Sequence, residues 1–412
     1  MKKYLESLVC VSCGSKYSFK EIVYSCPKCG DTLDITYDYD AIARSINKKL
    51  LAERTPNLAK YLELLPILEP RKMVSLGEGS TPLLNSKRLA ARLGLKNLYL
   101  KDETRNPTGV FKDRATAIVA TKALEFDRDI TAIASTGNAA ASMAGYAAKA
   151  GLRCIVMIPE TTPIGKVSQS IAYGARIVQV KGNYDQVFDL VTVACEKFGW
   201  YNCNPAINPY RTEGKKTMAY EICEQLNWKV PDWVIVPIGN GCNLAGHWKG
   251  FIEFYGLGFI SNKPRMVGIQ AQGSCPVVTA FNEKADRVEP VTPHTLAGAI
   301  AVGKPRNATK TLKALRESEG IAEAVSDDSL LEAQRMLASS EGIFGEPAAV
   351  APLAGLRKLV EKGTIDRTDN VVLVITGNGL KDPEAALKTV VKPLLVAPNL
   401  QELEPLRSKL AA

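Results

Sequence analysis

Short apolar runs alternate with amphipathic or alanine-rich segments along most of this chain. The apolar runs have the length of buried strands, and segments with helical spacing of apolar residues separate them. Strands that are apolar throughout and alternate with helices are typical of a parallel sheet covered by helices on both faces. The pattern therefore predicts an α/β fold, with strands at 97–100, 130–134, 152–158, 176–180, 233–238, 266–271 and 370–375 and with helices such as 139–150 and 214–226.

The length of 412 residues is too great for one ordinary hydrophobic core, so we expect several structural units. Residues 1–37 are cysteine-rich and unlike the rest, and we expect them to form a small metal-binding unit. The segment 39–72 has a helical pattern and connects this unit to the remainder. We expect a large α/β domain from residues 38–123 and 202–412, with residues 124–201 forming a small mobile α/β domain inserted in it.

The composition is that of a soluble globular protein, with 46% hydrophobic and 23% charged residues. The net charge of +9, from 52 basic and 43 acidic residues, is modest for this length. No basic run is interleaved with aromatic residues, so we do not expect nucleic-acid binding. No stretch resembles a signal peptide or a membrane span. We therefore expect a cytoplasmic protein whose ten cysteines are thiols and metal ligands.

Four cysteines near the start have the spacing of a metal site. They form the pairs Cys10-Val-Ser-Cys13 and Cys26-Pro-Lys-Cys29, and a glycine follows each pair. Each short loop lets two thiolates bind one ion, and the glycine tolerates the backbone turn that directs amide groups toward the sulfurs. Four thiolates suit a structural Zn²⁺ and staple a unit too small for its own core. Iron with the same ligands is the alternative.

Lys112 is the candidate nucleophile of the chain. It follows the turn Pro107-Thr-Gly109 and the aromatic Phe111, and it begins an alanine-rich helix. The positive end of a helix lowers the pKa of an amine placed there. Such an amine is suited to forming an imine with the aldehyde of pyridoxal 5′-phosphate (PLP).

A small polar loop, Ser135-Thr136-Gly137-Asn138, follows the predicted strand 130–134 and opens the helix 139–150. Free backbone N–H groups and two hydroxyls at this helix start are suited to holding the carboxylate of an amino acid. An ordinary helix cap has the same composition, so the tetrapeptide alone leaves both interpretations open.

Two further loops follow predicted strands. After strand 233–238, two glycines in three positions let the backbone fold closely around a phosphate, in a loop made of Gly239, Asn240, Gly241, Cys242 and Asn243. After strand 370–375, the hydroxyl of Thr376 is placed to meet a pyridine nitrogen as a neutral partner. Ligands of parallel sheets sit outside the carboxyl ends of strands, which is where these loops lie.

Together these motifs resemble the threonine synthase family, which consists of PLP enzymes of fold type II with the tryptophan synthase β-like architecture. The resemblance covers nearly the whole chain. Besides the four cysteines, it rests on the segments 76–83, 106–114, 135–138, 208–217, 342–348 and 376–382.

The resemblance implies a PLP-dependent lyase, usually a homodimer, that converts O-phospho-L-homoserine and water to L-threonine and phosphate. The resemblance implies that Lys112 forms the Schiff base and that Phe111 contacts the cofactor. It implies that Asn138 contacts the ring hydroxyl of the cofactor, Thr376 its ring nitrogen and residues 239–243 its phosphate. For the substrate, it implies that Ser135 and Thr136 bind the carboxylate and that Arg211 binds the phosphate.

Five positions depart from the family pattern. Val110 and Ala139 stand where the family usually has hydroxyl residues, Pro205-Ala206 where it usually has Asn-Ser, and Cys242 where it usually has glycine. Several of the lost groups are ones expected to hydrogen-bond a substrate phosphate, and each charge-assisted bond is worth about 1.5–3 kcal/mol. The departures leave the assignment of PLP as the cofactor nearly intact, but they allow a substrate other than O-phospho-L-homoserine.

Three alternatives follow. One is a different PLP-dependent β- or γ-elimination or replacement enzyme, such as a serine/threonine dehydratase or a cysteate-type synthase. Another is a catalytically silent binding protein that keeps the fold, against which the retained Lys112 argues. A nucleic-acid role for the cysteine unit is weaker, because no basic stripe with aromatic residues flanks it. We expect this unit to serve packing or oligomer contacts.

Overall fold

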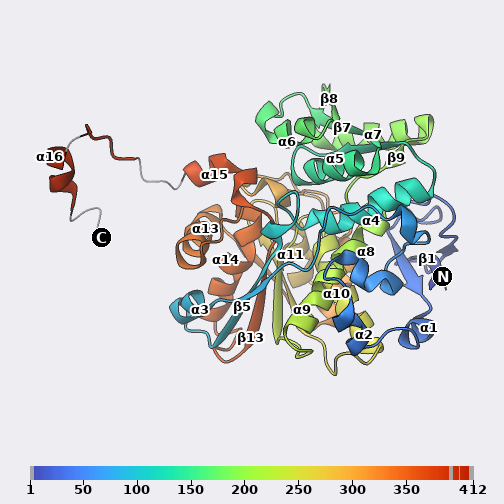
Figure 1. Ribbon diagram of the computed structural model, residues 1–412, viewed down its shortest axis with the longest axis horizontal. Helices are drawn as coiled ribbons and strands as arrows, with labels where there is room; N and C mark the ends of the chain where they lie inside the picture. Colours follow the sequence, from blue (N-terminus) through green and yellow to red (C-terminus); the bar gives the residue numbers. More distant parts are fainter. Residues whose placement is uncertain (1–3, 389–392, 399, 408–412) are drawn as a thin grey trace.

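The computed structural model describes residues 4–388, 393–398 and 400–407, and its strands form three sheets (Figure 1). The N-terminal sheet is small and antiparallel, in the order β2-β1-β3, and lies beside the cysteine pairs. Its strands are β1 (Leu5–Cys10), β2 (Lys16–Tyr17) and β3 (Leu33–Tyr37).

The large sheet has six strands in the order β12-β11-β10-β13-β5-β4, and every neighbouring pair is parallel except β4 with β5. Its members are β4 (Leu83–Asn85), β5 (Asn97–Asp102), β10 (Trp233–Pro237), β11 (Arg265–Ala271), β12 (Ile321–Val325) and β13 (Asn370–Ile375). The four strands predicted for this region are confirmed, with ends shifted by up to two residues. The edge strands β4 and β12 are absent from the prediction because β4 has three residues and Glu323 interrupts the apolar sequence of β12.

The second parallel sheet is smaller and has the order β8-β7-β6-β9. It contains β6 (Ile130–Ala134), β7 (Arg153–Pro159), β8 (Arg176–Val180) and β9 (Tyr201–Asn202). The three longer strands confirm the prediction for this part of the chain. The two-residue β9 carries too few positions to show a pattern.

The described helices are α1 (Tyr39–Ala43), α2 (Lys48–Glu53), α3 (Lys87–Leu93), α4 (Lys112–Glu125), α5 (Asn138–Ala150), α6 (Ser168–Ala172), α7 (Tyr184–Phe198), α8 (Tyr210–Lys215), α9 (Thr217–Gln225), α10 (Cys242–Gly256), α11 (Pro276–Asn282), α12 (Ala308–Glu317), α13 (Asp327–Glu341), α14 (Pro347–Glu361), α15 (Pro383–Leu387) and α16 (Leu400–Leu403). The predicted helix 214–226 is thus divided between α8 and α9. Within the described ranges, no helix is long and apolar enough to cross a membrane.

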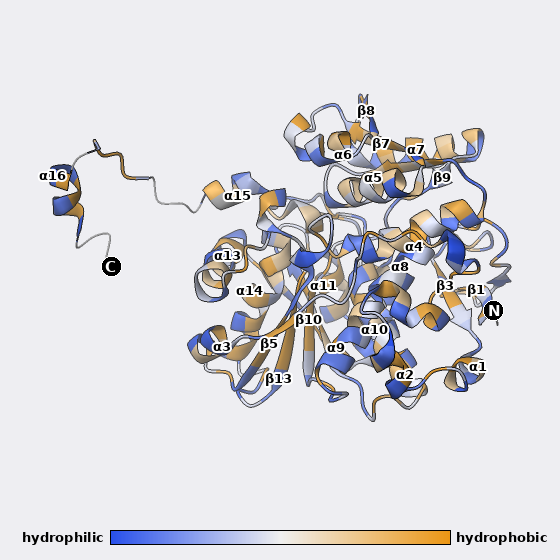
Figure 2. Ribbon diagram, in the orientation of Figure 1, coloured by the Kyte–Doolittle hydropathy of each residue, from blue (hydrophilic) through white to orange (hydrophobic). Residues whose placement is uncertain are grey.

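Helices cover both faces of the large sheet, with α3, α13 and α14 on one side and α9 and α10 on the other (Figure 1). Helix α12 packs against α10 and β11 on this second side. Successive residues of β10 enter opposite cores. Val234 packs in the core that contains α10, and Ile235 packs in the core that contains α14. Both side chains are fully buried. This two-sided burial explains why the central strands β10 and β13 are apolar throughout (Figure 2).

Helix α4 joins the two parallel sheets. It packs against α8 beside the large sheet and against α5 beside the small sheet (Figure 1). Its first residue is Lys112. The candidate nucleophile therefore lies where the carboxyl ends of strands from both sheets converge.

Candidate active site

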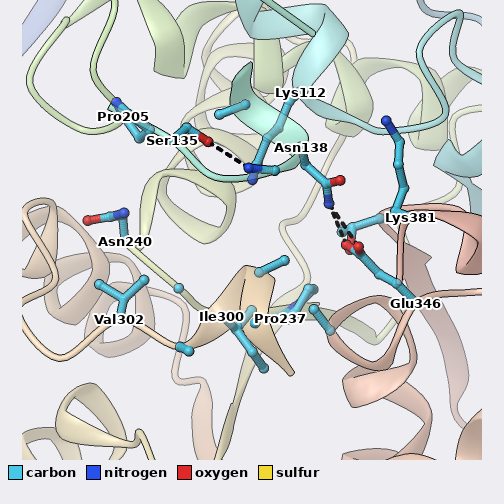
Figure 3. Close-up of a pocket in the computed structure, with 18 of the residues that line it drawn as sticks. Lys112, Ser135, Asn138, Pro205, Pro237, Asn240, Ile300, Val302, Glu346 and Lys381 are labelled. Atoms are coloured by element: carbon cyan, nitrogen blue, oxygen red, sulfur yellow. Dashed lines mark hydrogen bonds between the residues drawn. The ribbon is translucent and has the colours of Figure 1, made fainter. Parts of the chain in front are cut away.

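A cavity of about 370 Å³ opens between the two parallel sheets. This volume lies in the range of small-molecule sites. Loops after β6, β10 and β13 and the starts of α4, α5 and α10 contribute to its lining (Figure 3). Of the residues proposed from the sequence, the lining includes Phe111, Lys112, Ser135, Thr136, Asn138, Gly239, Asn240, Gly241, Cys242, Asn243 and Thr376.

The loop before Lys112 is fastened to the end of β13. The Phe111 N–H donates to the carbonyl of Thr376 at 2.9 Å, and the Asn378 N–H donates to the carbonyl of Gly109 at 2.9 Å. Gly109 has φ +81°, which explains the glycine in this turn. These contacts hold the start of α4 against the carboxyl end of a central strand.

The two residues after Lys112, Asp113 and Arg114, fix α4 through buried hydrogen bonds and ion pairs. The Asp113 carboxylate accepts hydrogen bonds from the Thr108 N–H and hydroxyl, at 2.7 and 2.5 Å. Arg114 is fully buried and pairs with Glu103 at 2.7 Å and with Glu221 at 2.5 Å. The Lys-Asp-Arg sequence thus combines one side chain that lines the cavity with two that fix the helix carrying it.

The electrostatic surroundings of Lys112 favour the neutral amine. Burial lowers its pKa to about 8, Glu346 opposes this change, and the nearby cations Lys215, Arg211 and Lys381 lower the pKa further. Within the described part of the chain, no hydrogen bond or ion pair engages the amine. A lysine with this pKa is partly neutral near pH 7 and is suited to act as a nucleophile or base.

The loop after β6 meets the cavity through Ser135, Thr136 and Asn138. The Ser135 hydroxyl accepts hydrogen bonds from the N–H groups of Gly137 and Ala140, at 3.4 and 3.3 Å, at the start of α5. The Asn138 amide donates to both carboxylate oxygens of Glu346, at 2.8 and 2.9 Å (Figure 3). The loop therefore bonds to N–H groups at the start of α5 and also lines the cavity, although the N-cap residue Gly137 has no side-chain cap.

The loop after β10 has the close backbone packing that its glycines predict. Gly241 has φ +91°, and a Cβ at this position would lie 1.9 Å from the Thr311 hydroxyl oxygen. The loop leads into α10, a helix of fifteen residues whose N-terminus begins at Cys242. Both polar side-chain atoms of Asn243 are buried without a hydrogen-bond partner. A helix N-terminus and unpartnered amide groups form a suitable cradle for a phosphate.

Thr376 lies at the end of β13 and is 3% exposed. Its carbonyl is used by Phe111, whereas its hydroxyl has no hydrogen-bond partner among the described residues. A free hydroxyl at the carboxyl end of a strand remains available to a ligand.

Arg211 is not among the lining residues. Its guanidinium is buried, and Nη1 donates to the carbonyl of Cys203 at 2.8 Å, while Nε has no partner. Lys215, one helical turn later on α8, lines the cavity instead.

Several lining residues escaped the sequence analysis as individual positions. Lys215, Glu346 and Lys381 lie inside three of the motifs that carry the family resemblance, and membership of these motifs is the sequence signal that could identify them. Burial raises the pKa of Glu346 and lowers that of Lys381. Lys166 and Tyr184 come from the small-sheet side and had no motif to identify them.

The five departures from the family pattern occupy different positions around this cavity. Ala139, Pro205 and Cys242 line it. Val110 is fully buried and forms a bridge to Gly377, and Ala206 is 7% exposed with φ +66°. Apolar side chains therefore occupy the cavity wall where hydroxyl or amide groups were expected.

The four N-terminal cysteines meet at one point. Their sulfur atoms all lie within 4.8 Å of one another, and three of the sulfur pairs are 3.3, 3.5 and 3.6 Å apart. Gly14 and Gly30 have φ +69° and +77°, and their N–H groups close the two turns onto Cys10 and Cys26. Four thiols at this spacing fit a tetrahedral ion with metal–sulfur distances of about 2.3 Å.

The cysteine unit is anchored to the helices behind the cavity. Asp34, on β3, pairs with Lys249 of α10 at 3.1 Å and with Lys310 of α12 at 3.0 Å. Tyr37 donates to Glu213 of α8 at 2.6 Å. These contacts connect the N-terminal sheet to the helices that carry the loop 239–243 and Lys215.

Comparisons with known proteins identify the family that this chain resembles. The family described as "Pyridoxal-phosphate dependent enzyme" matches residues 74–377. "Threonine synthase" of Methanocaldococcus jannaschii is 46% identical over 397 residues, covering 96% of this chain and 98% of that protein. "Threonine synthase" of Methanosarcina acetivorans is 45% identical, covering 96% and 97%.

Solved structures share the fold. A threonine deaminase from T.th. superposes with a TM-score of 0.62 at 27% identity, covering 72% of this chain and 92% of that chain. The processed threonine deaminase isoform 2 of Solanum lycopersicum superposes with a TM-score of 0.65 at 21% identity, covering 91% and 98%.

Proposed function

The chain belongs to the pyridoxal-phosphate-dependent enzymes and, within them, to the threonine synthase family, and from this premise we propose that it converts O-phospho-L-homoserine and water to L-threonine and phosphate. The observation that carries the proposal is the identity of 46% with a threonine synthase over 96% of the chain. The predicted family and fold class are thereby confirmed.

The cavity fits PLP in its donor set. Lys112 offers an amine without a partner among the described residues, Thr376 offers a free hydroxyl, and Asn243 offers orphaned amide atoms beside a helix N-terminus. The residues that would hold the cofactor are Lys112, Phe111, Asn138, Gly239, Asn240, Gly241, Cys242, Asn243 and Thr376. When bound, PLP withdraws electrons from the substrate and so makes its Cα and Cβ protons acidic.

The protein's own groups supply binding and proton transfer. The Lys112 amine, with a pKa of about 8, accepts and returns protons at Cα and Cβ of the substrate. Ser135 and Thr136 receive the substrate carboxylate at the start of α5. Glu346 orients Asn138 through the two hydrogen bonds between them.

The charge of the cavity supports a phosphorylated substrate. Its charged lining residues are Lys112, Lys166, Lys215, Lys381, Glu346 and Asp382, an excess of lysines over carboxylates. Lys166 belongs to the short 3-10 helix η4 (Ile164–Val167) and is exposed, so a substrate that enters from solvent can reach it. We assign the substrate phosphate to Lys166. Arg211 lies outside the lining, and its positive charge adds to the attraction of the cavity for the substrate phosphate.

The assay uses purified holoenzyme and O-phospho-L-homoserine. Threonine and phosphate are expected to appear in equal amounts. Because Ala139 and Pro205 replace polar residues of the family pattern, L-serine and L-threonine are tested in parallel. Formation of an oxo acid and ammonia from these, with no turnover of the phosphorylated substrate, would reject the proposal in favour of a dehydratase.

We propose that the four cysteines hold a structural Zn²⁺, which braces the helices behind the cavity. Double substitution Cys13→Ser/Cys29→Ser is expected to remove one zinc per chain and to lower the melting temperature. Cys275→Ser, outside the cluster, is the matched control and is expected to keep the metal. Metal analysis and thermal unfolding measure both effects, and an unchanged melting temperature after zinc loss would contradict the bracing role.

Two further features complete the proposal. Residues 124–201 form the small domain, and its exposed lining residues Lys166 and Tyr184 support a movement that closes the cavity.

The enzyme is proposed to be a homodimer that binds neither nucleic acid nor membrane. Light scattering of the purified protein tests the dimer, and a monomer mass would reject it.

A further inference from the structure

Lys215 is a buried cation at the edge of the candidate cofactor site. It is 6% exposed and lines the cavity near the end of α8. Its ammonium nitrogen lies 5.5 Å from the centre of the Phe111 ring. A Cβ added at Gly246 of α10 would lie 3.0 Å from the Lys215 Cβ. The close packing of α8 on α10 thus fixes Lys215 relative to the helix that begins at the loop 239–243.

No anion in the described part of the chain pairs with this amine. Its ionisable neighbours are the Cys242 thiol, the Arg211 guanidinium and the Lys112 amine, and the two cations repel it. The next residue gives a direct contrast, because Lys216 pairs with Glu213 at 2.7 Å and with Glu253 at 2.9 Å. A buried ammonium without a counter-ion is costly, which is a reason to expect an external anion at Lys215.

The position of Lys215 indicates which anion this is. Cys242 belongs to the candidate phosphate loop, and Phe111 directly precedes the candidate nucleophile. Lys381 instead lies near Glu346, across the cavity from Asn240 of the phosphate loop (Figure 3). Lys215 is therefore the cavity lysine associated with the phosphate loop.

We propose that Lys215 binds the phosphate group of PLP and supplies its counter-charge, while the loop 239–243 and the N-terminus of α10 supply N–H donors. The inference rests on the PLP dependence of the proposed function. It gives α8 a role in holding the cofactor, and lysine is a common partner of phosphate groups. Burial lowers the pKa of Lys215 to about 8, and a phosphate dianion beside it would keep the amine protonated near neutral pH.

The test compares two ligands that differ only in the phosphate. Apoenzyme of the wild type and of Lys215→Met is titrated with PLP and with pyridoxal, and dissociation constants are read from absorbance. We expect Lys215→Met to raise the dissociation constant of PLP about tenfold or more and to leave that of pyridoxal unchanged. Equal weakening of both ligands, or no weakening of PLP, would overturn the proposal.

Lys381→Met is the matched control, because it removes a lysine from the same cavity on the Glu346 side. Its ratio of PLP to pyridoxal affinity is expected to change much less than that of Lys215→Met. Lys215→Arg restores the charge and is expected to recover part of the PLP affinity. If Lys215→Met does not fold by circular dichroism, Lys215→Gln is titrated in the same way, and it must show the same selective loss.

A final measurement distinguishes binding of the phosphate of PLP from binding of the phosphate of the substrate. If Lys215 instead served the substrate, Lys215→Met would bind PLP normally and raise the KM for O-phospho-L-homoserine, which would overturn the assignment to the cofactor. The titrations need no turnover. A wrong choice of amino-acid substrate would therefore leave their outcome intact, and the inference can fail while the proposed activity stands.

Discussion

The two sides of the cavity differ in burial and in chemistry. On the large-sheet side, Lys215, Asn243 and Thr376 are buried and keep polar groups without partners among the described residues. On the small-sheet side, Lys166 and Tyr184 are exposed. Unpartnered buried groups suit a ligand that stays bound, because leaving them unsatisfied is costly. Exposed groups suit a ligand that enters and leaves. From this contrast we propose that the phosphate of the cofactor lies on the large-sheet side and the phosphate of the substrate on the small-sheet side.

The largest expected effect comes from the residue at the junction of the two sides. Lys112→Ala is expected to lower kcat by about 1000-fold or more, because it removes both the nucleophile and the proton carrier. Borohydride treatment followed by peptide mapping should place the pyridoxyl group on Lys112 in the wild type and nowhere in the variant. Lys112→Arg keeps the charge and serves as the control. Substantial activity in Lys112→Arg would show that the site works without a nucleophilic amine.

The pH dependence of cofactor capture reports on the large-sheet side. The pKa of Lys112 is lowered from 10.5 to about 8, and the neutral amine is the form that attacks an aldehyde. The rate of PLP capture by apoenzyme should therefore rise up to about tenfold per pH unit below 8 and level off above it. Stopped-flow absorbance between pH 6 and pH 10 measures the profile. A rate that still climbs between pH 9 and pH 10 would mean that the amine is not desolvated.

The sequence predicts the central strands well and, of the edge strands of the two parallel sheets, only β8. The strands at 130–134, 176–180 and 370–375 have the predicted bounds. The N-terminal sheet was not predicted, because β2 has two residues and the whole unit is held by turns around the cysteines. β12 was missed because three of its five residues are only half-buried and Glu323 interrupts its apolar sequence. A run of apolar residues identifies a strand that is buried on both faces, whereas the edge strands β4, β9 and β12 are too short or too interrupted to show one.

The predicted loops line the cavity, whereas the direction of the side chains on α8 does not follow from the sequence. Residues directly after β6, β10 and β13 reach the cavity because strand ends meet at one edge. Arg211 and Lys215 are one turn apart on a helix of six residues, and the sequence does not reveal which of them faces the cavity. That choice depends on how α8 packs against α10. Glu346 was missed for the same reason, since its role appears only when Asn138 is seen beside it.

The small-sheet side yields a smaller expected effect. Lys166→Met is expected to raise the KM for O-phospho-L-homoserine by roughly 3- to 10-fold, less than a buried charge would, because solvent screens an exposed lysine. Its PLP affinity should stay unchanged. Lys149→Met, an exposed lysine of α5 outside the lining, is the matched control. Weakened PLP binding in Lys166→Met would break the division of roles between the two sides.

The smallest expected effect concerns a departure from the family pattern. Ala139 lines the cavity at the start of α5, near Ser135 and Thr136. Ala139→Ser adds one hydroxyl there, and a net hydrogen bond of about 0.5–1.5 kcal/mol predicts a KM for O-phospho-L-homoserine lower by roughly 2- to 10-fold. Steady-state kinetics with PLP saturating measures this change.

Ala140→Ser is the control that distinguishes the lower KM expected for Ala139→Ser from a general effect of adding a hydroxyl to this helix. Ala140 is fully buried and does not line the cavity, so its serine would cost stability and leave KM unchanged. A raised KM in Ala139→Ser would mean that the apolar wall is adapted to its substrate as it stands. The alanine would then be part of the specificity of this chain, and the search for a better substrate would move to amino acids with an apolar group in place of the phosphate.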